Sequence, residues 1–551
     1  MDKLWLKHYQ QGVPHEINLS EFSSLADLFN ESCRKFTDKI AYMNMGSEIN
    51  FTQLDKLSAE FASYLQSLGL QKGARVALMM PNLLQYPVAL FGILRAGFIV
   101  VNVNPLYTSE ELTYQINDSG AEVILVMANF AKTVEISLPN MPALKHVVIT
   151  EMGDLFPSIK RIIVNAVLKY IKKMVPTYHI HHSINFNQAL RIGQSHSMSP
   201  IQMTHQDIAF IQYTGGTTGV SKGAMLTHGN MLANVMQASA WIAPMSIGSD
   251  DIVVTALPLY HIFSLTANCL TFLKEGSKNI LITNPRDISR FINEIKQSGF
   301  TVITGVNTLF NALLNHPNFS SIDFSKLKLA LSGGMALQKS VSIAWQEKTN
   351  SPILEAYGLT EASPAVTMNP MYLKEYNGSI GLPLPSTEIS IRDPNGKEVA
   401  IGEKGELSIS GPQVMPGYWQ HPDETALVFW PDMYLRTGDI ATVDDHGFIY
   451  LLDRIKDMIL ISGFNVYPNE IEQVISLMPG VLEVGVIGVV EGGSTEKVKA
   501  CIVKRDPSLT AEQVIAHARL HLTAYKIPKI VEFYKELPKT NVGKILKRAL
   551  K

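Results

Sequence analysis

One short segment, YTGGTTGVSKGAML at residues 213–226, combines glycines, hydroxyl side chains and a single lysine, Lys222, without any acidic side chain. Glycines leave backbone N–H groups open to a ligand, and such a nest of amides with a mobile ammonium group complements an anion that has several oxygens. A glycine-rich surface turn is the alternative interpretation. We favour a phosphate-binding loop, because the segment follows an apolar run, lacks acidic residues and fits a strand, a loop and then a helix.

The two commonest phosphate-binding loops do not fit this segment. A Walker A loop has glycine immediately before its lysine, whereas Ser221 precedes Lys222 here. The dinucleotide fingerprint needs a GxGxxG spacing, which Gly215, Gly216 and Gly219 do not provide. The segment is therefore a phosphate-binding loop of another kind.

A second segment, EAYGLTEASP at residues 355–364, places an aromatic ring, a hydroxyl and a carboxylate close together. Tyr357 can stack on a base, Thr360 can donate to a phosphate, and Glu361 can hold a hard cation through its oxygens. A capping Thr or Glu is also common where a helix starts. Read alone, this segment is weak support for a nucleotide site.

Two further polar groups lie nearer the C-terminus. YLRTGD at residues 434–439 ends in Asp439, and Arg454 follows it fifteen residues later. A carboxylate accepts hydrogen bonds from two vicinal ribose hydroxyls and an arginine donates to them, although an exposed turn with an ion pair is the alternative. In LPKTNVGKILKRAL, Lys544 follows Gly543 in a short polar loop, which by itself is typical of a solvated tail.

Composition limits the kind of protein that carries these groups. The chain of 551 residues is long enough for several domains, and its 46% hydrophobic and 17% charged residues are typical of a globular protein. A net charge of −2 gives no global basic field, so we expect no nucleic-acid partner. Cys33, Cys269 and Cys501 are too far apart for a disulfide framework or a CxxC metal site, and with no secretory signal in the sequence they favour the cytoplasm.

Runs rich in Val and Ile alternate with helical patterns, which predicts an α/β fold with largely parallel strands that are buried on both faces. The runs are ARVALMM, GFIVVNV, AEVILVM, DIAFIQYT, DIVVTALP, FTVITGV and LKLALSGG. After residue 429 the pattern changes to short strands with turn residues, and we place a domain boundary near Arg454. The remainder is large enough for a small α+β domain.

A basic amphipathic helix is predicted at residues 159–174, and Pro176 ends it. Its apolar stripe is Ile159, Ile162, Ile163, Ala166, Val167, Tyr170, Ile171 and Met174, and its basic residues are Lys160, Arg161, Lys169, Lys172 and Lys173. Such a helix can lie on an anionic bilayer surface. Periodicity equally allows the alternative that the stripe packs on the protein.

Seven segments in this order resemble the core motifs of the adenylate-forming acyl-CoA synthetases: YTGGTTGVSKGA, PLYHIF, LSGGMAL, YGLTE, YLRTGD, DRIKDMILISGFNVYPNEIE and PKTNVGK. The chain outside these motifs is similar to bacterial long-chain fatty-acid CoA ligases. The resemblance implies a large N-terminal domain (1–453) of layered α/β subdomains with a small β-barrel-like part. A hinge (454–458) and a small mobile α+β C-terminal domain (459–551) follow.

The resemblance also implies an activity. ATP and a long-chain fatty acid form acyl-AMP and pyrophosphate, and the acyl group then passes to the thiol of coenzyme A. Mg²⁺ is the expected cofactor. Lys544 is expected to bridge the acyl carboxylate and the α-phosphate as a charge and not as a base. Thr360 is expected at the α-phosphate, and Asp439 with Arg454 at the ribose.

The implied site residues fall into several groups. ATP and AMP binding is assigned to Tyr213, Thr214, Gly215, Gly216, Thr217, Thr218, Gly219, Val220, Ser221, Lys222, Gly223, Ala224, Gly333, Gly334, Tyr357, Gly358, Asp439 and Arg454. Catalysis is assigned to Lys544, Thr360, Glu361 and His261, and the metal to Thr214 and Glu361. Coenzyme A is assigned to Gly463, Phe464 and Lys526, the hinge to Lys456, and the acyl tunnel to Leu265 and Val306.

Two of these positions carry information about the substrate. His261 stands where amino-acid-activating relatives tend to have an aspartate, which favours an acyl group without an amine; a hydrogen-bonded core histidine is the alternative. Leu265 stands where some long-chain relatives have a gating tryptophan, so the sequence departs from that gate.

The expected partners are a long-chain fatty acid, ATP, coenzyme A and the inner face of an anionic cytoplasmic membrane, with a homodimer left open. Three alternatives remain at this point. They are a fatty acyl-AMP ligase that passes its product to a carrier protein, a medium-chain or aryl-CoA ligase, and a non-catalytic lipid- or nucleotide-binding membrane protein. The last is disfavoured because Lys544 and Glu361 are both present.

Overall fold

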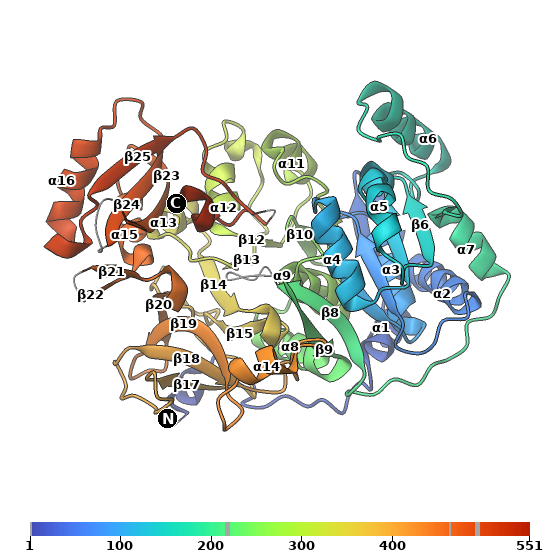
Figure 1. Cartoon of the computed structure of the whole chain (residues 1–551), viewed down its shortest axis with the longest axis horizontal. Helices are drawn as coiled ribbons and strands as arrows, with labels where there is room; N and C mark the ends of the chain where they lie inside the picture. The colour runs from blue at the N-terminus through green and yellow to red at the C-terminus, as the bar shows by residue number, and fades with distance from the viewer. Residues whose placement is uncertain (1–2, 215–220, 462–463, 491–495, 541) are drawn as a thin grey trace.

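The computed structural model describes residues 3–214, 221–461, 464–490, 496–540 and 542–551. Within these ranges the strands form three sheets in the N-terminal part and two in the C-terminal part (Figure 1). The predicted α/β class is confirmed. All seven Val- and Ile-rich runs contain a strand.

A nine-stranded sheet runs in the order β16-β15-β14-β13-β12-β10-β11-β1-β2. Its strands are β1 (Ile40–Asn44), β2 (Ser47–Asn50), β10 (Ile252–Thr255), β11 (Lys278–Leu281), β12 (Val302–Gly305), β13 (Leu329–Gly333), β14 (Ile353–Gly358), β15 (Ala365–Met368) and β16 (Leu382–Pro383). The neighbours from β14 to β1 pair in parallel, and β2, β15 and β16 add antiparallel edges.

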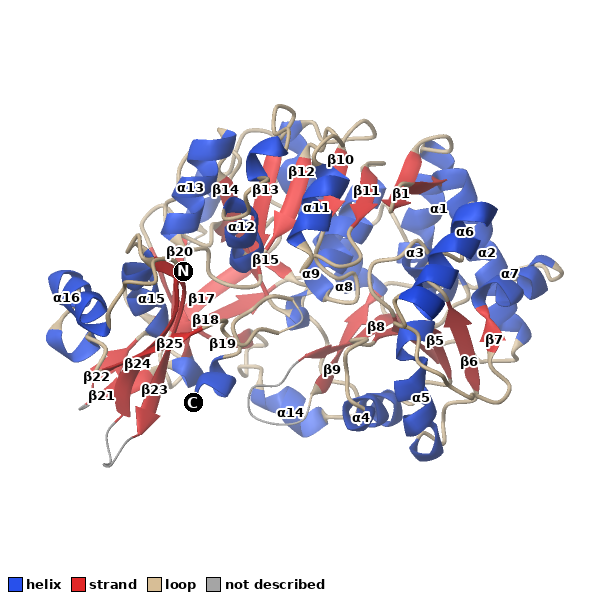
Figure 2. Cartoon of the chain, turned by 90° about the horizontal axis from the view of Figure 1, so that it is seen from above, coloured by secondary structure: helices blue, strands red, loops and turns tan. Residues whose placement is uncertain are grey.

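A seven-stranded sheet lies beside it, in the order β7-β6-β5-β3-β4-β8-β9 (Figure 2). Its strands are β3 (Arg75–Met79), β4 (Ile99–Asn102), β5 (Val123–Met127), β6 (His146–Thr150), β7 (Ile184–Asn185), β8 (Ile208–Thr214) and β9 (Lys222–Thr227). Only the β8–β9 pair is antiparallel. The central strands are buried on both faces, as continuous apolar runs predict.

Helices cover both large sheets. They are α1 (Leu25–Lys35), α2 (Phe51–Ser67), α3 (Gln85–Arg95), α4 (Ser109–Ser119), α5 (Ala131–Ser137), α6 (Ser158–Ala166), α7 (Phe186–Gln194), α8 (His228–Ile242), α9 (Ile262–Ser264), α10 (Phe272–Lys274), α11 (Ile288–Ile295), α12 (Asn307–Leu314), α13 (Lys339–Thr349) and α14 (Pro422–Leu427). Short π-helical stretches, Val167–Ile171 and Leu265–Thr271, follow α6 and α9. Capping boxes start α2, α4 and α8, because their Asn or Thr side chains accept from backbone N–H groups that a helix leaves free.

The expectation of a small β-barrel-like part is wrong. Strands β17 (Glu388–Arg392), β18 (Gly405–Ser410), β19 (Leu435–Val443) and β20 (Ile449–Arg454) form an antiparallel sheet in sequence order. Within the described residues its edge strands do not pair with each other, so the sheet stays open. Closure into a barrel would require the edge strand β20 to pair with the other edge strand, β17. After β20 the chain instead continues into the C-terminal part.

The C-terminal part is small and of mixed α+β type, as predicted. The strands β21 (Ile459–Ile461) and β22 (Phe464–Val466) form a hairpin, and β23 (Val481–Val490), β24 (Glu496–Lys504) and β25 (Ile530–Tyr534) form a three-stranded sheet. The helices α15 (Pro468–Ser476) and α16 (Ala511–His521) pack beside them. This part has an apolar core of its own, around Val466, Ile471 and Val484.

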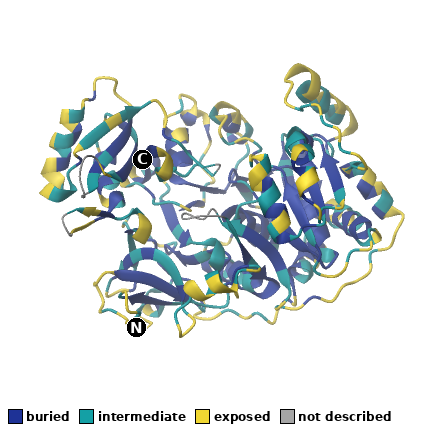
Figure 3. Ribbon diagram, in the orientation of Figure 1, coloured by how far each residue is buried: buried dark blue, intermediate teal, exposed yellow. Residues whose placement is uncertain are grey.

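The predicted amphipathic helix forms α6 and its π-helical extension, and Figure 1 shows this arm projecting from the molecule. The packing alternative is wrong for the six largest apolar side chains of its stripe, which face solvent (Figure 3). Their exposed fractions are 77% for Ile159, 64% for Ile162, 56% for Ile163, 70% for Tyr170, 72% for Ile171 and 52% for Met174.

The arm has a fixed base. Asn165 Nδ2 donates to Glu151 Oε2 at 2.9 Å, and Asn165 Oδ1 accepts from the backbone N–H of Gly153 at 2.8 Å. Lys160 donates to the backbone carbonyl of Met45, so this lysine belongs to the base and not to the exposed face. Among the described residues no helix is both long and apolar enough to cross a bilayer.

Candidate active site

Strands β13 and β14 end beside each other and carry Gly333 and Gly358, two of the glycines assigned to ATP and AMP binding. The register pairs Gly333 with Ala356, one residue before Tyr357. A Cβ atom added to Gly333 would lie 3.0 Å from the Ala356 carbonyl oxygen, and one added to Gly358 would lie 2.1 Å from the Pro364 carbonyl oxygen. Backbone therefore approaches backbone at both positions, and a side chain at Gly358 cannot be accommodated without movement.

Tyr357 meets the pair that was predicted to hold a ribose. Its hydroxyl donates to Asp439 Oδ2 at 2.6 Å, and the β19–β20 ladder places Asp439 opposite Arg454. The Arg454 Nε atom lies 3.2 Å from Asp439 Oδ1, but Oδ1 has no well-aligned hydrogen bond with the described residues. A buried carboxylate oxygen without a hydrogen bond is costly, and a ligand hydroxyl would satisfy it.

This ion pair joins a buried carboxylate to a guanidinium that is partly exposed. Burial would lower the pKa of Arg454, but the Asp439 carboxylate raises it above its ordinary value. Burial, reinforced by Asp439, raises the pKa of Tyr357 well above its ordinary value. The tyrosine therefore keeps its proton and acts as a donor to the carboxylate.

Lys544 is brought into this site from the far end of the chain. Thr308 Oγ1 donates to the carbonyl of Gly543 at 2.8 Å, which joins α12 to the loop that carries the lysine. Gly543 has φ of 84°, and a Cβ atom there would lie 2.8 Å from the same Thr308 hydroxyl. Burial, together with repulsion from Arg454, lowers the pKa of Lys544 to about 8.

His261 also faces this group. Burial, with a smaller contribution from Lys544, lowers its pKa to about 4, so its imidazole is neutral at pH 7. The backbone N–H of Phe263 points at His261 Nδ1 at 3.4 Å, which places the ring proton on Nε2. A neutral histidine in this state can donate one hydrogen bond to an oxygen of a ligand.

The phosphate-binding segment is only partly within the described residues. Tyr213 and Thr214 end β8 and Lys222, Gly223 and Ala224 begin β9, whereas Gly215, Gly216, Thr217, Thr218, Gly219 and Val220 lie outside the described residues. The Ser221 hydroxyl donates to the Thr214 carbonyl at 2.5 Å. The two strands pair antiparallel, with Thr214 opposite Lys222.

The expected order of strand, loop and helix is wrong here, because a second strand follows the loop and α8 comes only after it. The physical reason is a further partner for β9. Trp419 donates its backbone N–H to the Gly223 carbonyl at 2.8 Å, and Met225 donates its own to the Gly417 carbonyl at 3.0 Å. These bonds hold β9 extended until Thr227 caps α8.

Lys222 and Glu361 share a neighbour that sequence reasoning missed. Lys222 forms an ion pair with Glu424 on α14 and lies 5.5 Å from the centroid of the Tyr418 ring. The Tyr418 hydroxyl donates to Glu361 Oε1 at 2.7 Å. Glu361 Oε2 makes no hydrogen bond within the described part of the chain, and neither does the hydroxyl of Thr360.

The hinge region contains Lys456 in a short 3₁₀ turn, Ile455–Asp457. Burial, together with repulsion from Arg454, lowers the pKa of Lys456 to about 8. Asp453, at the end of β20, accepts from the backbone N–H of Asn469 at 2.8 Å and therefore caps α15 of the C-terminal part. Burial raises the pKa of Asp453 to about 6.

The residues predicted to bind coenzyme A lie on the C-terminal part. Phe464 is 56% exposed and stacks on Tyr525 with ring centroids 4.9 Å apart, an aromatic partner that sequence reasoning missed. Lys526 is paired with both carboxylate oxygens of Glu470, at 2.6 and 2.8 Å. Gly463 lies outside the described residues. Figure 1 places the β21–β22 hairpin well apart from β8 and β9.

The two acyl-tunnel candidates are both buried. Val306 precedes α12, and Cβ atoms added to Gly334 and Gly543 would lie 3.9 and 3.3 Å from its methyl groups. Val306 therefore lies between the glycine turn after β13 and the loop that carries Lys544. Leu265 is fully buried and begins the π-helical stretch that packs against α8.

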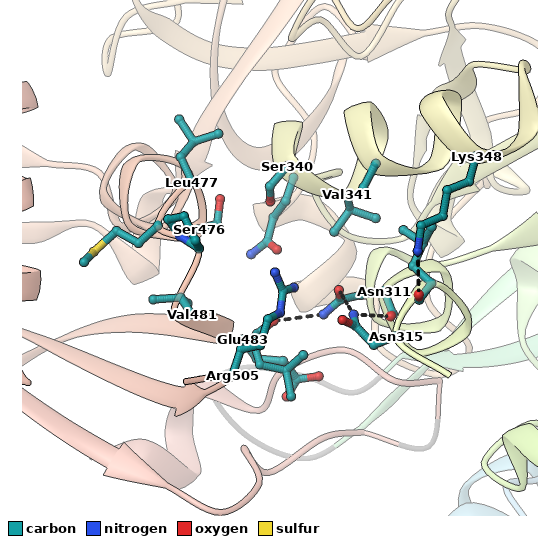
Figure 4. A pocket seen from close by; sticks show the side chains of 16 residues that line it. Asn311, Asn315, Ser340, Val341, Lys348, Ser476, Leu477, Val481, Glu483 and Arg505 are labelled. Atoms are coloured by element: carbon teal, nitrogen blue, oxygen red, sulfur yellow. Dashed lines mark hydrogen bonds between the residues drawn. The ribbon is translucent and has the colours of Figure 1, made fainter. Parts of the chain in front are cut away.

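The C-terminal part is held to the N-terminal part by side-chain amides. Asn311 Nδ2 donates to the Leu482 carbonyl at 2.9 Å, and Gln473 Nε2 donates to the Leu337 carbonyl at 3.0 Å. Between these bonds the parts enclose a cavity of about 200 Å³ (Figure 4). None of the predicted site residues lines it.

The structure combines a large α/β unit with a small C-terminal unit whose Lys544 lies near Asp439 and Arg454 of the large one. The chain belongs to the AMP-binding enzyme family. Residues 29–419 match the AMP-binding enzyme family, and residues 470–544 match its C-terminal domain.

Relatives of known name agree with this assignment. A long-chain-fatty-acid–CoA ligase from Yersinia pestis is 54% identical over 552 residues, which cover 100% of this chain and 98% of the relative. A long-chain-fatty-acid–CoA ligase from Bacillus subtilis is 38% identical, with 100% and 97% covered. Both are similar to this chain along its full length.

Solved structures share the fold. An anthranilate CoA ligase in complex with anthranoyl-AMP superposes with a TM-score of 0.85 at 25% identity, with 97% of each chain covered. ATP-bound MatB from Rhodopseudomonas palustris superposes with a TM-score of 0.79 at 29% identity, with 95% of this chain and 98% of that one covered.

Proposed function

We propose that this protein is an ATP-dependent long-chain acyl-CoA synthetase. It joins a long-chain fatty acid to AMP with release of pyrophosphate, and it then transfers the acyl group to the thiol of coenzyme A. The observation that carries the proposal is the position of Lys544, which is partly buried and close enough to Asp439, Arg454 and His261 to interact with their charges or protons, although it comes from the far end of the chain. The full-length relatives named as long-chain-fatty-acid–CoA ligases support the substrate class.

The nucleotide is proposed to lie across the ends of β13, β14 and β19. Adenine packs on the Tyr357 ring and on the backbone of Gly333 and Gly334, where the absence of side chains lets a flat ring approach the main chain. The ribose hydroxyls donate to Asp439 Oδ1, the oxygen that lacks a hydrogen bond with the described residues. The phosphates extend toward Lys222, and Thr360 donates to the α-phosphate.

Glu361 and Thr214 fit the predicted Mg²⁺. The Glu361 carboxylate keeps one oxygen without a hydrogen bond to the described residues, and magnesium prefers one or two such oxygens together with phosphates and waters to a cage of protein ligands. Mg²⁺ bound there supplies positive charge to the triphosphate. The single described cluster of three potential ligands, Asp444, Asp445 and His446, lies in the β19–β20 turn and plays no part in the proposal.

The first half-reaction brings two anions together. Two unit charges 4 Å apart interact by about 4 kcal/mol at an effective dielectric constant of 20, so a cation between the acyl carboxylate and the α-phosphate is needed. Lys544 is proposed to be that cation and to stabilise the charge that grows as pyrophosphate leaves. Although burial lowers its pKa to about 8, the two anions favour its charged form. His261 donates through Nε2 to the carboxylate.

The second half-reaction is proposed to need another arrangement of the two domains. We assign residues 1–453 to the large domain, 454–458 to the hinge and 459–551 to the small domain, which rotates about Lys456. Rotation removes Lys544 and brings the β21–β22 hairpin to the acyl-AMP. The stacked rings of Phe464 and Tyr525 then line the route of the thiol, and Lys526 exchanges Glu470 for a phosphate of coenzyme A.

Product formation from fatty acids of graded length tests this function. We expect AMP to form with long-chain acids and steady turnover to require coenzyme A, because the acyl-AMP otherwise stays on the enzyme. The measurement is AMP release by chromatography with each acid, with and without coenzyme A. Turnover without coenzyme A would favour the carrier-linked ligase, a preference for short or aryl acids would favour the other ligases, and no turnover with any acid would refute the proposal.

We further propose that the enzyme contacts an anionic membrane through the α6 arm, on its cytoplasmic side. The exposed apolar side chains of the arm, such as Ile159 and Ile171, would enter the headgroup boundary. Lys169, Lys172 and Lys173 are exposed beside them and would lie near acidic headgroups, at about 1 kcal/mol each. Because Asn165 and Lys160 fix its base, the arm can hold the rest of the enzyme at a set distance from lipid.

Changing Lys169, Lys172 and Lys173 together to glutamine should weaken binding to vesicles that contain phosphatidylserine by roughly a hundredfold at low salt. Co-sedimentation measures this, with phosphatidylcholine vesicles for comparison. The matched control changes Lys35, Lys397 and Lys551, which are equally exposed elsewhere, to glutamine and should bind as the unmodified protein does. Equal binding by both variants would rule out the arm as the contact.

A further inference from the structure

A chain of buried amides joins the seven-stranded sheet to the loop that carries His261. Asn102, at the end of β4, donates from Nδ2 to Gln212 Oε1 at 3.0 Å. Gln212, on β8, donates from Nε2 to the carbonyl oxygen of Tyr260 at 2.8 Å. The exposed fractions of Asn102 and Gln212 are 4% and 5%, so these bonds are shielded from water. Tyr260 is the residue immediately before His261.

Two more side chains hold the same loop. Asn82 Oδ1 accepts from the backbone N–H of Leu259 at 2.8 Å. The Tyr86 hydroxyl lies 2.9 Å from the Leu259 carbonyl oxygen and 2.6 Å from Asn102 Oδ1. Residues 258–261 belong to no strand, and side chains pair three of their backbone groups, namely the N–H and carbonyl of Leu259 and the carbonyl of Tyr260. The position of the histidine therefore depends on residues of the other sheet.

Gln212 has a place on β8 that connects two parts of the proposed reaction. Its strand continues into Tyr213 and Thr214, the first two residues of the phosphate-binding segment. Its side chain reaches the loop whose next residue would donate to the acyl carboxylate. Among the side chains that hold the His261 loop, the amide of Gln212 is the one that ties it directly to the phosphate-binding strand.

We propose that Gln212 is a positioning residue for adenylate formation, and that its amide aligns the His261 loop with the phosphate-binding strand. This inference rests on the proposed function and assigns a new residue to the same site. Gln212 acts through Tyr260 and His261 and touches neither substrate. Its side chain must donate on one side and accept on the other, which an amide does and an ionised carboxylate cannot.

The substitution Gln212→Glu tests this requirement, because pH decides whether the new side chain can donate. A protonated glutamic acid donates to the Tyr260 carbonyl and accepts from Asn102, whereas the ionised form only accepts. Burial raises the pKa of a carboxyl group, so the variant should gain its proton near neutral pH. We expect pyrophosphate release to be about tenfold to a hundredfold slower than normal at about pH 8.5, since a lost buried hydrogen bond costs ~1–3 kcal/mol.

Lowering the pH to about 5.5 should then reduce the difference in pyrophosphate-release rate between the variant and the unmodified enzyme by at least about tenfold. The KM for ATP should change less than about threefold at any pH. The titratable groups around the amide do not produce such a profile. Burial holds the pKa of Tyr86 and that of Tyr260 well above their ordinary values, and it holds the pKa of His261 at about 4. The recovery is therefore a signature of the introduced carboxyl group.

A matched control makes the same change at a distant buried amide. Gln237 is fully buried and donates to the Pro385 carbonyl at 2.7 Å and to Gln413 Oε1 at 3.1 Å. Gln237→Glu should lower the melting temperature without a recovery of pyrophosphate release at low pH. Should Gln212→Glu not fold, Tyr86→Phe carries the test, because it removes only the hydroxyl that reaches Leu259 and should slow pyrophosphate release at unchanged KM for ATP.

The inference and the function on which it rests fail in different ways. An unmodified protein that releases no pyrophosphate with any fatty acid would refute the proposed function. The inference is overturned if the unmodified protein is active and Gln212→Glu matches it at every pH, or if the Gln212→Glu and Gln237→Glu variants share one pH profile. If only Tyr86→Phe can be measured, normal kinetics in that variant overturn it.

Discussion

Replacing Lys544 by alanine should lower pyrophosphate release by about a hundredfold to a thousandfold, the usual effect of removing one charge-stabilising donor from a transition state. Lys544 lies among Asp439, Arg454 and His261, where the proposed α-phosphate and acyl carboxylate meet. Transfer of the acyl group from preformed acyl-AMP to coenzyme A should continue. In the rotated arrangement of the domains that is proposed for this step, Lys544 no longer lies in the site. Pyrophosphate release and thioester formation are measured separately.

Lys551→Ala is the control for this experiment, because Lys551 is an exposed lysine in the same C-terminal segment. It should leave both half-reactions unchanged. An equal loss of both half-reactions in Lys544→Ala would show that the lysine supports the fold or both arrangements. The role assigned to it would then be wrong.

Asp439→Asn should raise KM for ATP by about tenfold to a hundredfold, because a hydrogen bond to a charged group contributes ~1.5–3 kcal/mol. The change removes the charge that partners Arg454 and leaves one acceptor oxygen where the Tyr357 hydroxyl and the ribose each need one, so the melting temperature should fall as well. Initial rates at graded ATP concentrations give KM, and dye-based thermal melting gives the second value.

Asp445→Asn serves as the comparison, because Asp445 is exposed in the turn of the same β19–β20 hairpin. It should change neither the kinetics nor the melting temperature. If Asp439→Asn lowered the melting temperature but left KM for ATP unchanged, the carboxylate would be structural and the ribose would lie elsewhere.

The strands of the two large sheets could be predicted because their sequence pattern is unambiguous. Runs such as VILVM in β5 are apolar at every position, and only strands buried on both faces tolerate this. Tyr357, Asp439 and Lys544 were identified through a resemblance, and the structure brings them together as that resemblance implies. Their roles in catalysis stay predictions.

Other features depended on contacts that no local pattern reveals. The strand β9 was not expected between the loop and the helix, because the segment at residues 417–419, which bonds to it, is almost two hundred positions away. The resemblance implied a barrel-like part, and the turn signals could not correct it, because they show where strands reverse but not which edges pair. The exposure of the α6 stripe could not be predicted either, since a periodic pattern gives the same result for a packed and a free helix.

The missed site residues share a physical cause. Lys222 pairs with Glu424, 202 positions away, and Tyr418 reaches Glu361, 57 positions away. Gln212 contacts Tyr260 across 48 positions. Each of these side chains is an ordinary polar residue in the sequence, and its importance arises only from its partner. A lone glutamine on an apolar strand was the available signal, because a buried amide needs partners.

The last two residues of β20, Asp453 and Arg454, bear on when AMP leaves and when the enzyme reopens. Neighbouring side chains of a strand point to opposite sides, and here Arg454 meets the nucleotide side while Asp453 caps helix α15. A single peptide unit therefore separates Arg454, which is proposed to hold AMP, from Asp453, which holds the C-terminal part. If either of these two contacts is released, a small twist of the strand would loosen the other contact. Departure of AMP and reopening of the enzyme are therefore expected to occur as one coupled event.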